Sequence, residues 1–214
     1  MDYLQNVMGY FDQQQPLCAQ HDKISKDLYQ EYGVKAGLRD ENGKGVLAGL
    51  TNISDIRAFE YVDGVKRPAD GQLLYRGYDV KDLINGSRGS RFACEEAGYL
   101  LLFGELPTPE KLEEFCRVLG ECRTMPTNFT RDVIMKAPSH DIMNSMARSV
   151  LTLASYDPKA GDLEISNVLR QSIQLAGIFP MLAVYSYHAY NHYEKDGSMY
   201  IHRPDPELST AENF

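Results

Sequence analysis

The pattern of apolar residues in this 214-residue chain changes from that of strands to that of helices within Asp70-Gly-Gln-Leu-Leu-Tyr-Arg-Gly-Tyr-Asp-Val-Lys-Asp-Leu-Ile84. Between Gly45 and Arg76, Val, Ile, Thr and Tyr are mixed with turn residues, and an Asp63-Gly64 pair separates two apolar residues as in a β-hairpin. After Tyr78 the apolar residues recur at helical spacing. We therefore predict a mainly α fold with a small β-hairpin region towards the N-terminus.

Helical periodicity continues along the rest of the chain, interrupted by Gly, Pro and Ser. The predicted helices cover 80–85, 91–103, 108–123, 128–136, 140–156 and 162–194. Two shorter helices are predicted between Asp2 and Tyr32. Ser209 precedes Glu212 by three positions, which is the spacing of a capping box at a helix start. Because little room for a helix follows, we interpret the chain as cut from a longer protein.

The composition excludes several classes of protein. Hydrophobic residues make up 43% of the chain, enough for a sizeable core. A net charge of −8 argues against a nucleic-acid partner, which would require a surplus of Lys and Arg. No segment has the roughly 20 apolar residues of a membrane span, and no basic leader precedes an apolar run, so we predict a cytoplasmic protein with no membrane contact. Four cysteines without a C-x-x-C pair are interpreted as buried, reduced thiols: Cys18, Cys94, Cys116 and Cys122.

Two patterns resemble ligand sites but fail on their spacing. The glycines of 37–45 suggest a phosphate-binding loop, yet five residues separate Gly37 from Gly43 where the motif has four, and Gly45 replaces the required Ser or Thr. We interpret this loop as a turn. His188 and His192 are four residues apart, as in some zinc helices, but no glutamate lies between them and no third ligand follows at a known spacing.

The remaining histidines and the paired acids have ordinary interpretations. Ser139 is the predicted helix cap beside His140. His21 and His202 lie in polar stretches without the partners of a catalytic triad. Two adjacent pairs, Glu95-Glu96 and Glu113-Glu114, point in different directions on a helix and are predicted to lie on solvated faces.

The helix predicted over 141–155 carries small and flexible apolar residues on one face. A core face would have this pattern, and so would a contact between subunits. We predict a homodimer through this helix, with an interface made of Met143, Met146, Ala147, Val150, Leu151 and Ala154.

Several blocks of sequence follow one another in a fixed order along the chain. The quoted Asp70–Ile84 stretch follows Gly49-Leu-Thr-Asn-Ile-Ser-Asp-Ile56 and precedes Glu95-Glu-Ala-Gly-Tyr-Leu-Leu-Leu-Phe-Gly-Glu-Leu-Pro-Thr108. Ser139-His-Asp-Ile-Met-Asn-Ser-Met146 and Ala211-Glu-Asn-Phe214 complete the series. In this order the blocks resemble the citrate synthases, and several blocks in order are far more specific than any one motif.

The resemblance implies a helical homodimer with a large and a small domain that close over substrate. Residues 1–214 would form the N-terminal portion of the large domain, without the small domain and the C-terminal part of the parent polypeptide. The parent would be an acyltransferase of the tricarboxylic acid cycle that condenses acetyl-CoA with oxaloacetate and water. In the family, an aspartate removes a methyl proton from acetyl-CoA, one histidine stabilises the enol, and a second assists attack on the carbonyl. Acetyl-CoA is a substrate, so we predict no cofactor.

None of the family's catalytic blocks occurs in this sequence, so we assign no catalytic residue, no substrate-binding residue and no metal ligand. Ser209–Glu212 occupies the place where the family often has an oxaloacetate-contacting histidine. Arg76 is interpreted as pairing with a carboxylate to fix the hairpin against the first helices. We predict that the chain is inactive alone and supplies scaffold and dimer contacts. The alternatives are part of a 2-methylcitrate synthase, which would use propionyl-CoA, or a non-catalytic helical interaction module of the same ancestry.

Overall fold

The computed structural model divides the chain into two compact units, Met1–Thr51 and Asn52–Phe214. The described residues are 10, 14–21, 24–35, 37–40, 43, 45–46 and 48–214. In the first unit, a helix covers 14–21 and α2 covers Lys26–Glu31. These helices agree with the predicted helical segment, whose residues 2–9, 11–13 and 22–23 lie outside the described part.

The second unit begins with the predicted hairpin. β1 (Ser54–Val62) pairs antiparallel with β2 (Val65–Tyr75). The two residues between the strands, Asp63 and Gly64, have φ of 53° and 76°. Positive φ at both positions is the geometry of the type I′ turn that suits the twist of a hairpin. The Asp-Gly signal therefore located the turn correctly.

A second tight turn ends the sheet. β2 pairs with the short strand β3 (Tyr78–Asp79), with Tyr75 opposite Tyr78, so Arg76 and Gly77 form another two-residue turn. Their φ values, 49° and 90°, again lie in the left-handed region. Glycine accepts this conformation without cost, whereas arginine there is uncommon. The sequence pattern did not predict this turn.

The helices follow at the predicted places. They are α3 (Val80–Gly86), α4 (Ala93–Phe103), α5 (Pro109–Glu121), the π-helical turn η1 (Thr130–Met135), α6 (Ile142–Leu153), the 3₁₀ turn η2 (Ala154–Tyr156), α7 (Ile165–Lys195) and α8 (Thr210–Asn213). The mainly α fold with a small β element is thus confirmed. No helix among the described residues is long and apolar enough to cross a membrane.

Side-chain caps fix several helix starts. The side chain of Thr108 accepts from the amide of Lys111 at the start of α5, and Pro109 follows at the first helical position, where its missing N–H has no cost. At α6 the cap is Asp141, whose Oδ1 accepts from the Asn144 amide at 2.9 Å. The prediction that Ser139 caps this helix was wrong. Its hydroxyl accepts instead from the Asp141 amide at 3.1 Å, just before the helix begins.

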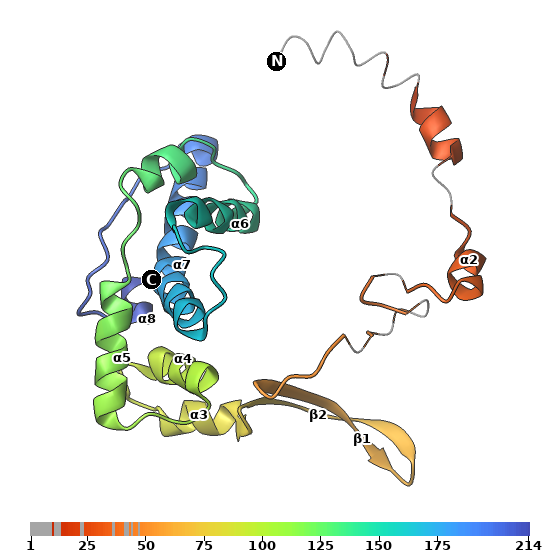
Figure 1. Ribbon diagram of the computed structural model, residues 1–214, viewed down its shortest axis with the longest axis horizontal. Helices are drawn as coiled ribbons and strands as arrows, with labels where there is room; N and C mark the ends of the chain where they lie inside the picture. Colours follow the sequence, from red (N-terminus) through yellow and green to blue (C-terminus); the bar gives the residue numbers. More distant parts are fainter. Residues whose placement is uncertain are drawn as a thin grey trace. The chain divides into compact units, whose positions relative to one another are not determined.

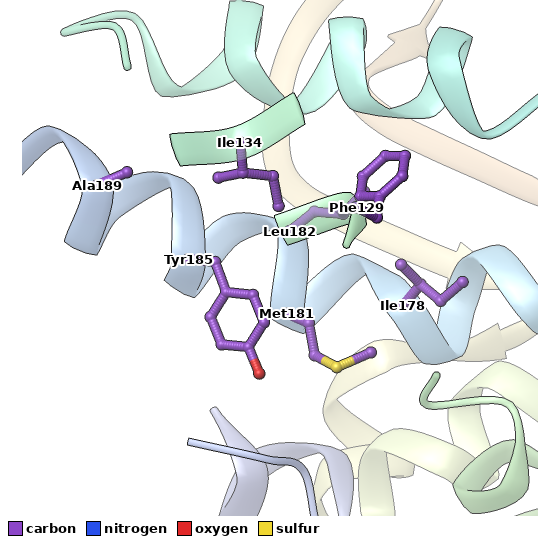
Figure 2. Packing of buried hydrophobic residues seen from close by; sticks show 7 residues of the cluster. All are labelled: Phe129, Ile134, Ile178, Met181, Leu182, Tyr185 and Ala189. Carbon is purple, nitrogen blue, oxygen red and sulfur yellow. The ribbon is translucent and has the colours of Figure 1, made fainter. Parts of the chain in front are cut away.

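The core of this unit is built on α7, which packs against α5, α6, η1 and α8 (Figure 1). Figure 2 shows its side chains meeting those of the segment that contains η1. The buried cluster consists of Phe129, Ile134, Ile178, Met181, Leu182, Tyr185 and Ala189. Gly177 lets α7 approach α5 closely, because a Cβ there would lie 3.1 Å from the Leu119 carbonyl oxygen.

Candidate functional site

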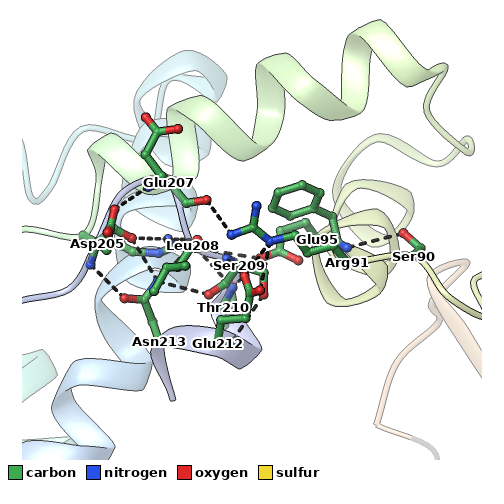
Figure 3. Close-up of polar contacts among 12 residues, drawn as sticks. Ser90, Arg91, Glu95, Asp205, Glu207, Leu208, Ser209, Thr210, Glu212 and Asn213 are labelled. Atoms are coloured by element: carbon green, nitrogen blue, oxygen red, sulfur yellow. Dashed lines mark hydrogen bonds and ion pairs between the residues drawn. The ribbon is translucent and has the colours of Figure 1, made fainter.

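A connected polar cluster holds residues 203–214 against α4 and α5 (Figure 3). At its centre, the carboxylate of Glu95 on α4 lies 3.7 Å from the guanidinium of Arg123, just after α5. The side chain of Arg123 is 4% exposed and that of Glu95 is 1% exposed. A buried pair of opposite charges requires further hydrogen bonds to offset its desolvation.

The segment that ends the chain provides those hydrogen bonds. Arg123 donates to the carbonyl oxygens of Asp205 and Leu208 and to Thr210 Oγ1. The Thr210 amide donates to Glu95 Oε1 at 2.6 Å. The prediction that Glu95 lies on a solvated face was therefore wrong, because residues more than 100 positions away in the sequence cover it.

The neighbouring acids behave differently from Glu95. Glu113 and Glu114 are exposed, as predicted. Glu96 is partly buried, and its Oε2 accepts from Ser87 Oγ at 2.6 Å. Adjacent acids on a helix point about 100° apart, so one can enter the interior while the next lies near the surface.

The predicted capping box is present at the start of α8. Ser209 Oγ accepts from the Glu212 amide, and Glu212 Oε2 accepts from the Ser209 amide at 2.7 Å. Arg91 adds an ion pair to Glu212 at 2.7 Å and donates to the Glu207 carbonyl oxygen at 3.0 Å. The Ser209 amide and Arg91 together lower the pKa of the Glu212 carboxyl below its ordinary value of 4.5.

A cavity of about 630 Å³ lies where the end of α5, η2 and the first half of α7 meet. Its apolar wall includes Met125, Val150 and Ile178, and its polar wall includes Asp157 and Arg170. Arg170 donates to Asp157 Oδ2 at 2.7 Å. Hydrogen bonds from Gln171, from Arg170 and from the backbone of Lys159 lower the pKa of Asp157 to about 2. The polar wall thus carries an ionised, internally paired network.

Arg76 fixes the sheet to α4, but its partner is not a carboxylate. Its Nε and Nη2 donate to the Leu101 carbonyl oxygen at 3.3 and 2.9 Å, and its Nη1 donates to Asn52 Oδ1 at 3.0 Å. Leu101 is in the last turn of α4, where carbonyls lack intrahelical partners and the helix dipole favours a cation. Arg76 therefore has a structural role, but it joins the sheet to α4 and not to the first helices, and the predicted carboxylate partner was wrong.

The histidines have aromatic and backbone neighbours. The ring of His188 packs edge-on against Tyr187 and Tyr200. His192 Nδ1 lies 2.9 Å from the Gly197 carbonyl oxygen. His140 is exposed. No group of three possible metal ligands occurs among the described residues, and the prediction that the chain binds no metal stays a prediction.

The apolar face of α6 divides into two parts. Met146 and Val150 are partly buried and pack against the core of this unit. Four residues at helical spacing are exposed in the single chain, with Met143 73% and Leu151 75% exposed. We call this set the α6 strip: Met143, Ala147 and Leu151 of α6, and Ala154, which follows α6 as the first residue of η2.

The four cysteines are free thiols, but they are not buried as predicted. Cys18 and Cys94 are exposed, and Cys116 and Cys122 are partly buried. Desolvation and, to a smaller extent, the carboxylate of Glu95 raise the pKa of Cys116 to about 11. A thiol with a raised pKa is mostly protonated at neutral pH and is a poor nucleophile.

The loop of 37–45 makes the turn expected of it, as far as it is described. Arg39 forms a bridge with Gly45, and its Nη1 donates to the Gly43 carbonyl oxygen at 2.9 Å. Residues 41, 42 and 44 lie outside the described part.

Comparison with known proteins identifies the family. A family model described as "Citrate synthase, C-terminal domain" matches residues 37–214. The chain belongs to the citrate synthase family. A citrate synthase of Corynebacterium glutamicum is 30% identical over 155 residues, which are 72% of this chain and 32% of that protein. A 2-methylcitrate synthase of Shewanella oneidensis is 30% identical over 119 residues, 54% of this chain and 28% of that protein.

The fold agrees with solved citrate synthases. The Thermoplasma acidophilum enzyme, solved as a ternary complex with carboxymethyl coenzyme A and oxaloacetate, superposes with a TM-score of 0.63 at 22% identity. The superposition covers 78% of this chain and 39% of that one. This chain spans about a third of the length of the two curated relatives. The buried Glu95–Arg123 pair, the cavity and the α6 strip all lie within the part that matches the family.

Proposed function

We propose that this chain is part of a citrate synthase whose complete polypeptide condenses acetyl-CoA with oxaloacetate and water to give citrate and CoA. The observation that supports this most is the match of residues 37–214 to the family model. The Corynebacterium glutamicum relative carries the name citrate synthase, and the Thermoplasma acidophilum enzyme binds oxaloacetate in its solved complex.

Within such an enzyme, the chain would act as scaffold. We place it as the N-terminal portion of the large domain, with its helices packed on α7, and in the cytoplasm. The remainder of the parent polypeptide would be its covalent partner and would carry the catalytic groups.

We infer that the 214-residue chain is inactive alone. General acid–base catalysis requires a titratable group within hydrogen-bond reach of the reacting atoms, commonly oriented by a carboxylate. His188 has aromatic neighbours, and His192 contacts a backbone carbonyl oxygen. Neither arrangement is the histidine and aspartate set that the family's reaction uses.

The test compares the 214-residue chain with the polypeptide obtained by extending the reading frame past Phe214. Each is purified and assayed for thiol release from acetyl-CoA with and without oxaloacetate. We expect the short chain to release thiol no faster than buffer alone, and the extended polypeptide to release it much faster. Turnover by the short chain, free of longer enzyme, would reject its inactivity. An extended polypeptide without turnover would favour the non-catalytic interaction module.

A 2-methylcitrate synthase is the second candidate, supported by the Shewanella oneidensis relative. Acetyl-CoA and propionyl-CoA differ by one methylene, which a pocket discriminates by about 10- to 200-fold. The ratio of kcat/KM for the two thioesters, measured on the extended polypeptide, separates the candidates.

We also propose that the chain contributes to a homodimer through the α6 strip. Its four side chains are small or flexible, they are exposed in the single chain, and they recur at helical spacing from α6 into the first residue of η2. Such a line lets two helices approach closely about a two-fold axis. Met146 and Val150, which belonged to the predicted interface, contact the chain's own core.

A further inference from the structure

The last residues of the chain, 203–214, are held mainly by polar contacts. We call these residues the strap. Ser209 is buried at 1% exposure, while the other strap residues are exposed or partly buried. The buried apolar cluster of Figure 2 contains no strap residue. A segment with so little apolar burial has little local stability apart from its hydrogen bonds.

Those hydrogen bonds converge on two buried charges. Arg123 donates to two carbonyl oxygens and one hydroxyl of the strap. Glu95 accepts from the Thr210 amide through Oε1, and its Oε2 has no hydrogen-bond partner. The strap thus forms hydrogen bonds with both members of a pair whose direct separation, 3.7 Å, is too long for a hydrogen bond.

The close fit of the strap depends on one glycine. A Cβ at Gly120 of α5 would lie 2.5 Å from the Pro206 carbonyl oxygen, a distance that a side-chain carbon does not tolerate. Backbone atoms of the strap would have to move if any other residue stood there. Gly120 has a buried position inside a regular helix, and its φ is not in the positive region, so α5 itself does not require glycine.

We propose that the strap is a separately opening unit, and that Glu95 and Arg123 are the latch that closes it. When the strap is closed, it supplies the hydrogen bonds that offset burial of the two charges. Removing either charge leaves the other buried and unpaired beneath the strap, which is strongly unfavourable. Water reaches the remaining charge most easily if the strap detaches. The strap contacts α7 through α8 but contributes no residue to the buried apolar cluster on α7, so that cluster stays packed when the strap opens.

Hydrogen exchange measured by mass spectrometry on the 214-residue chain tests the proposal. Arg123→Met removes the latch, and Arg117→Met is the matched control on the neighbouring helix α5. Arg117 pairs with Glu121 at 2.7 Å, but the two side chains are 60% and 62% exposed. Arg123→Met is expected to speed exchange in 203–214 by about tenfold or more, since hydrogen bonds to a charged group are lost. Hydrogen exchange in 178–189 should not change in Arg123→Met, and exchange in 203–214 should not change in the control Arg117→Met.

Gly120→Ala gives a second test that leaves both charges in place. Alanine raises the helix propensity of α5 relative to glycine. Amide hydrogen exchange should become faster in the strap but not in α5. General destabilisation of the fold would accelerate exchange in both segments. If Arg123→Met accelerated hydrogen exchange equally in 178–189 and 203–214, the proposal that the strap opens separately would be wrong. A strap unaffected by both substitutions would overturn the latch.

Discussion

At the scale of single residues, the arginines of this protein divide by what surrounds them. Arg76 and Arg123 donate to backbone carbonyl oxygens in partly or fully buried places. Arg57 and Arg117 form ion pairs whose side chains are more than half exposed. Exposed pairs contribute little to stability because water screens them, whereas a charge that satisfies buried carbonyls is costly to remove.

Arg76→Met should lower the free energy of unfolding by about 1 to 3 kcal/mol, because the last turn of α4 loses a charged donor. Arginine and methionine have a similar backbone cost at positive φ, so the change measures the lost contacts. Arg57→Met is the control and should change stability by less than about 0.5 kcal/mol. Urea unfolding followed by circular dichroism measures both. Equal effects of the two substitutions would contradict the capping role of Arg76.

Asp157 should make the chain sensitive to acid. Its pKa, about 2 in the folded protein, is below the ordinary value of 3.8, so its contribution to stability is complete above pH 3.8 and is lost as the pH falls towards 2. Asp157→Asn should reduce stability at pH 7 and flatten the loss of stability between about pH 4 and 2. Asp196→Asn, at an exposed position, is the control. Unfolding midpoints across this pH range measure the effect, and parallel curves for wild type and Asp157→Asn would reject it.

At the scale of secondary-structure elements, α6 carries the clearest unassigned surface. Ser145 and Ser149 lie on the buried side of this helix, and Ser149 Oγ donates to the Ser145 carbonyl oxygen at 2.7 Å. Met143 and Leu151 project from its outer side. Exposed apolar residues on the outer side of α6 support the proposed contact between two copies of the chain.

Ala147→Glu, in the middle of the α6 strip, should convert a dimer into monomer or aggregate. The two-fold axis would bring two like charges together in a buried interface, which carries a large desolvation cost. Ala69→Glu makes the same chemical change at an exposed position of β2 and should leave the assembly unchanged. Sedimentation of the extended polypeptide at matched concentration measures the state. A dimer that survives Ala147→Glu would exclude the strip as the interface.

At the scale of the whole molecule, many large apolar side chains are exposed among the residues that the structure describes. Exposed apolar side chains occur along β1, α6 and the start of α7, including Ile56, Leu151 and Ile165. This distribution agrees with a chain that matches about a third of the length of its relatives.

The molecule should bind no structural metal. Zinc sites use three or four protein ligands, and no group of three candidate ligands occurs within the described residues. After dialysis without chelator, elemental analysis should find far less than one zinc per chain. Stoichiometric zinc that persists would show that His188 and His192 are ligands together with a group outside those residues.

The sequence by itself determined the local features of this protein. Helix bounds, the Asp63-Gly64 turn and the Ser209–Glu212 capping box follow from residues within a few positions of one another. Such features depend on periodicity, backbone conformation and short-range hydrogen bonds, all of which can be read along the chain. The blocks in register also identified the family correctly.

Only the tertiary structure decided which side chains are buried and what they contact. Glu95 and Glu96 are equivalent as sequence, but one meets Arg123 and the Thr210 amide in the interior. The same holds for the apolar face of α6, whose two halves differ in burial because only one of them reaches the core of this unit. Burial and partner choice depend on segments brought together from distant parts of the sequence, and periodicity within one helix contains no information about what will pack against it.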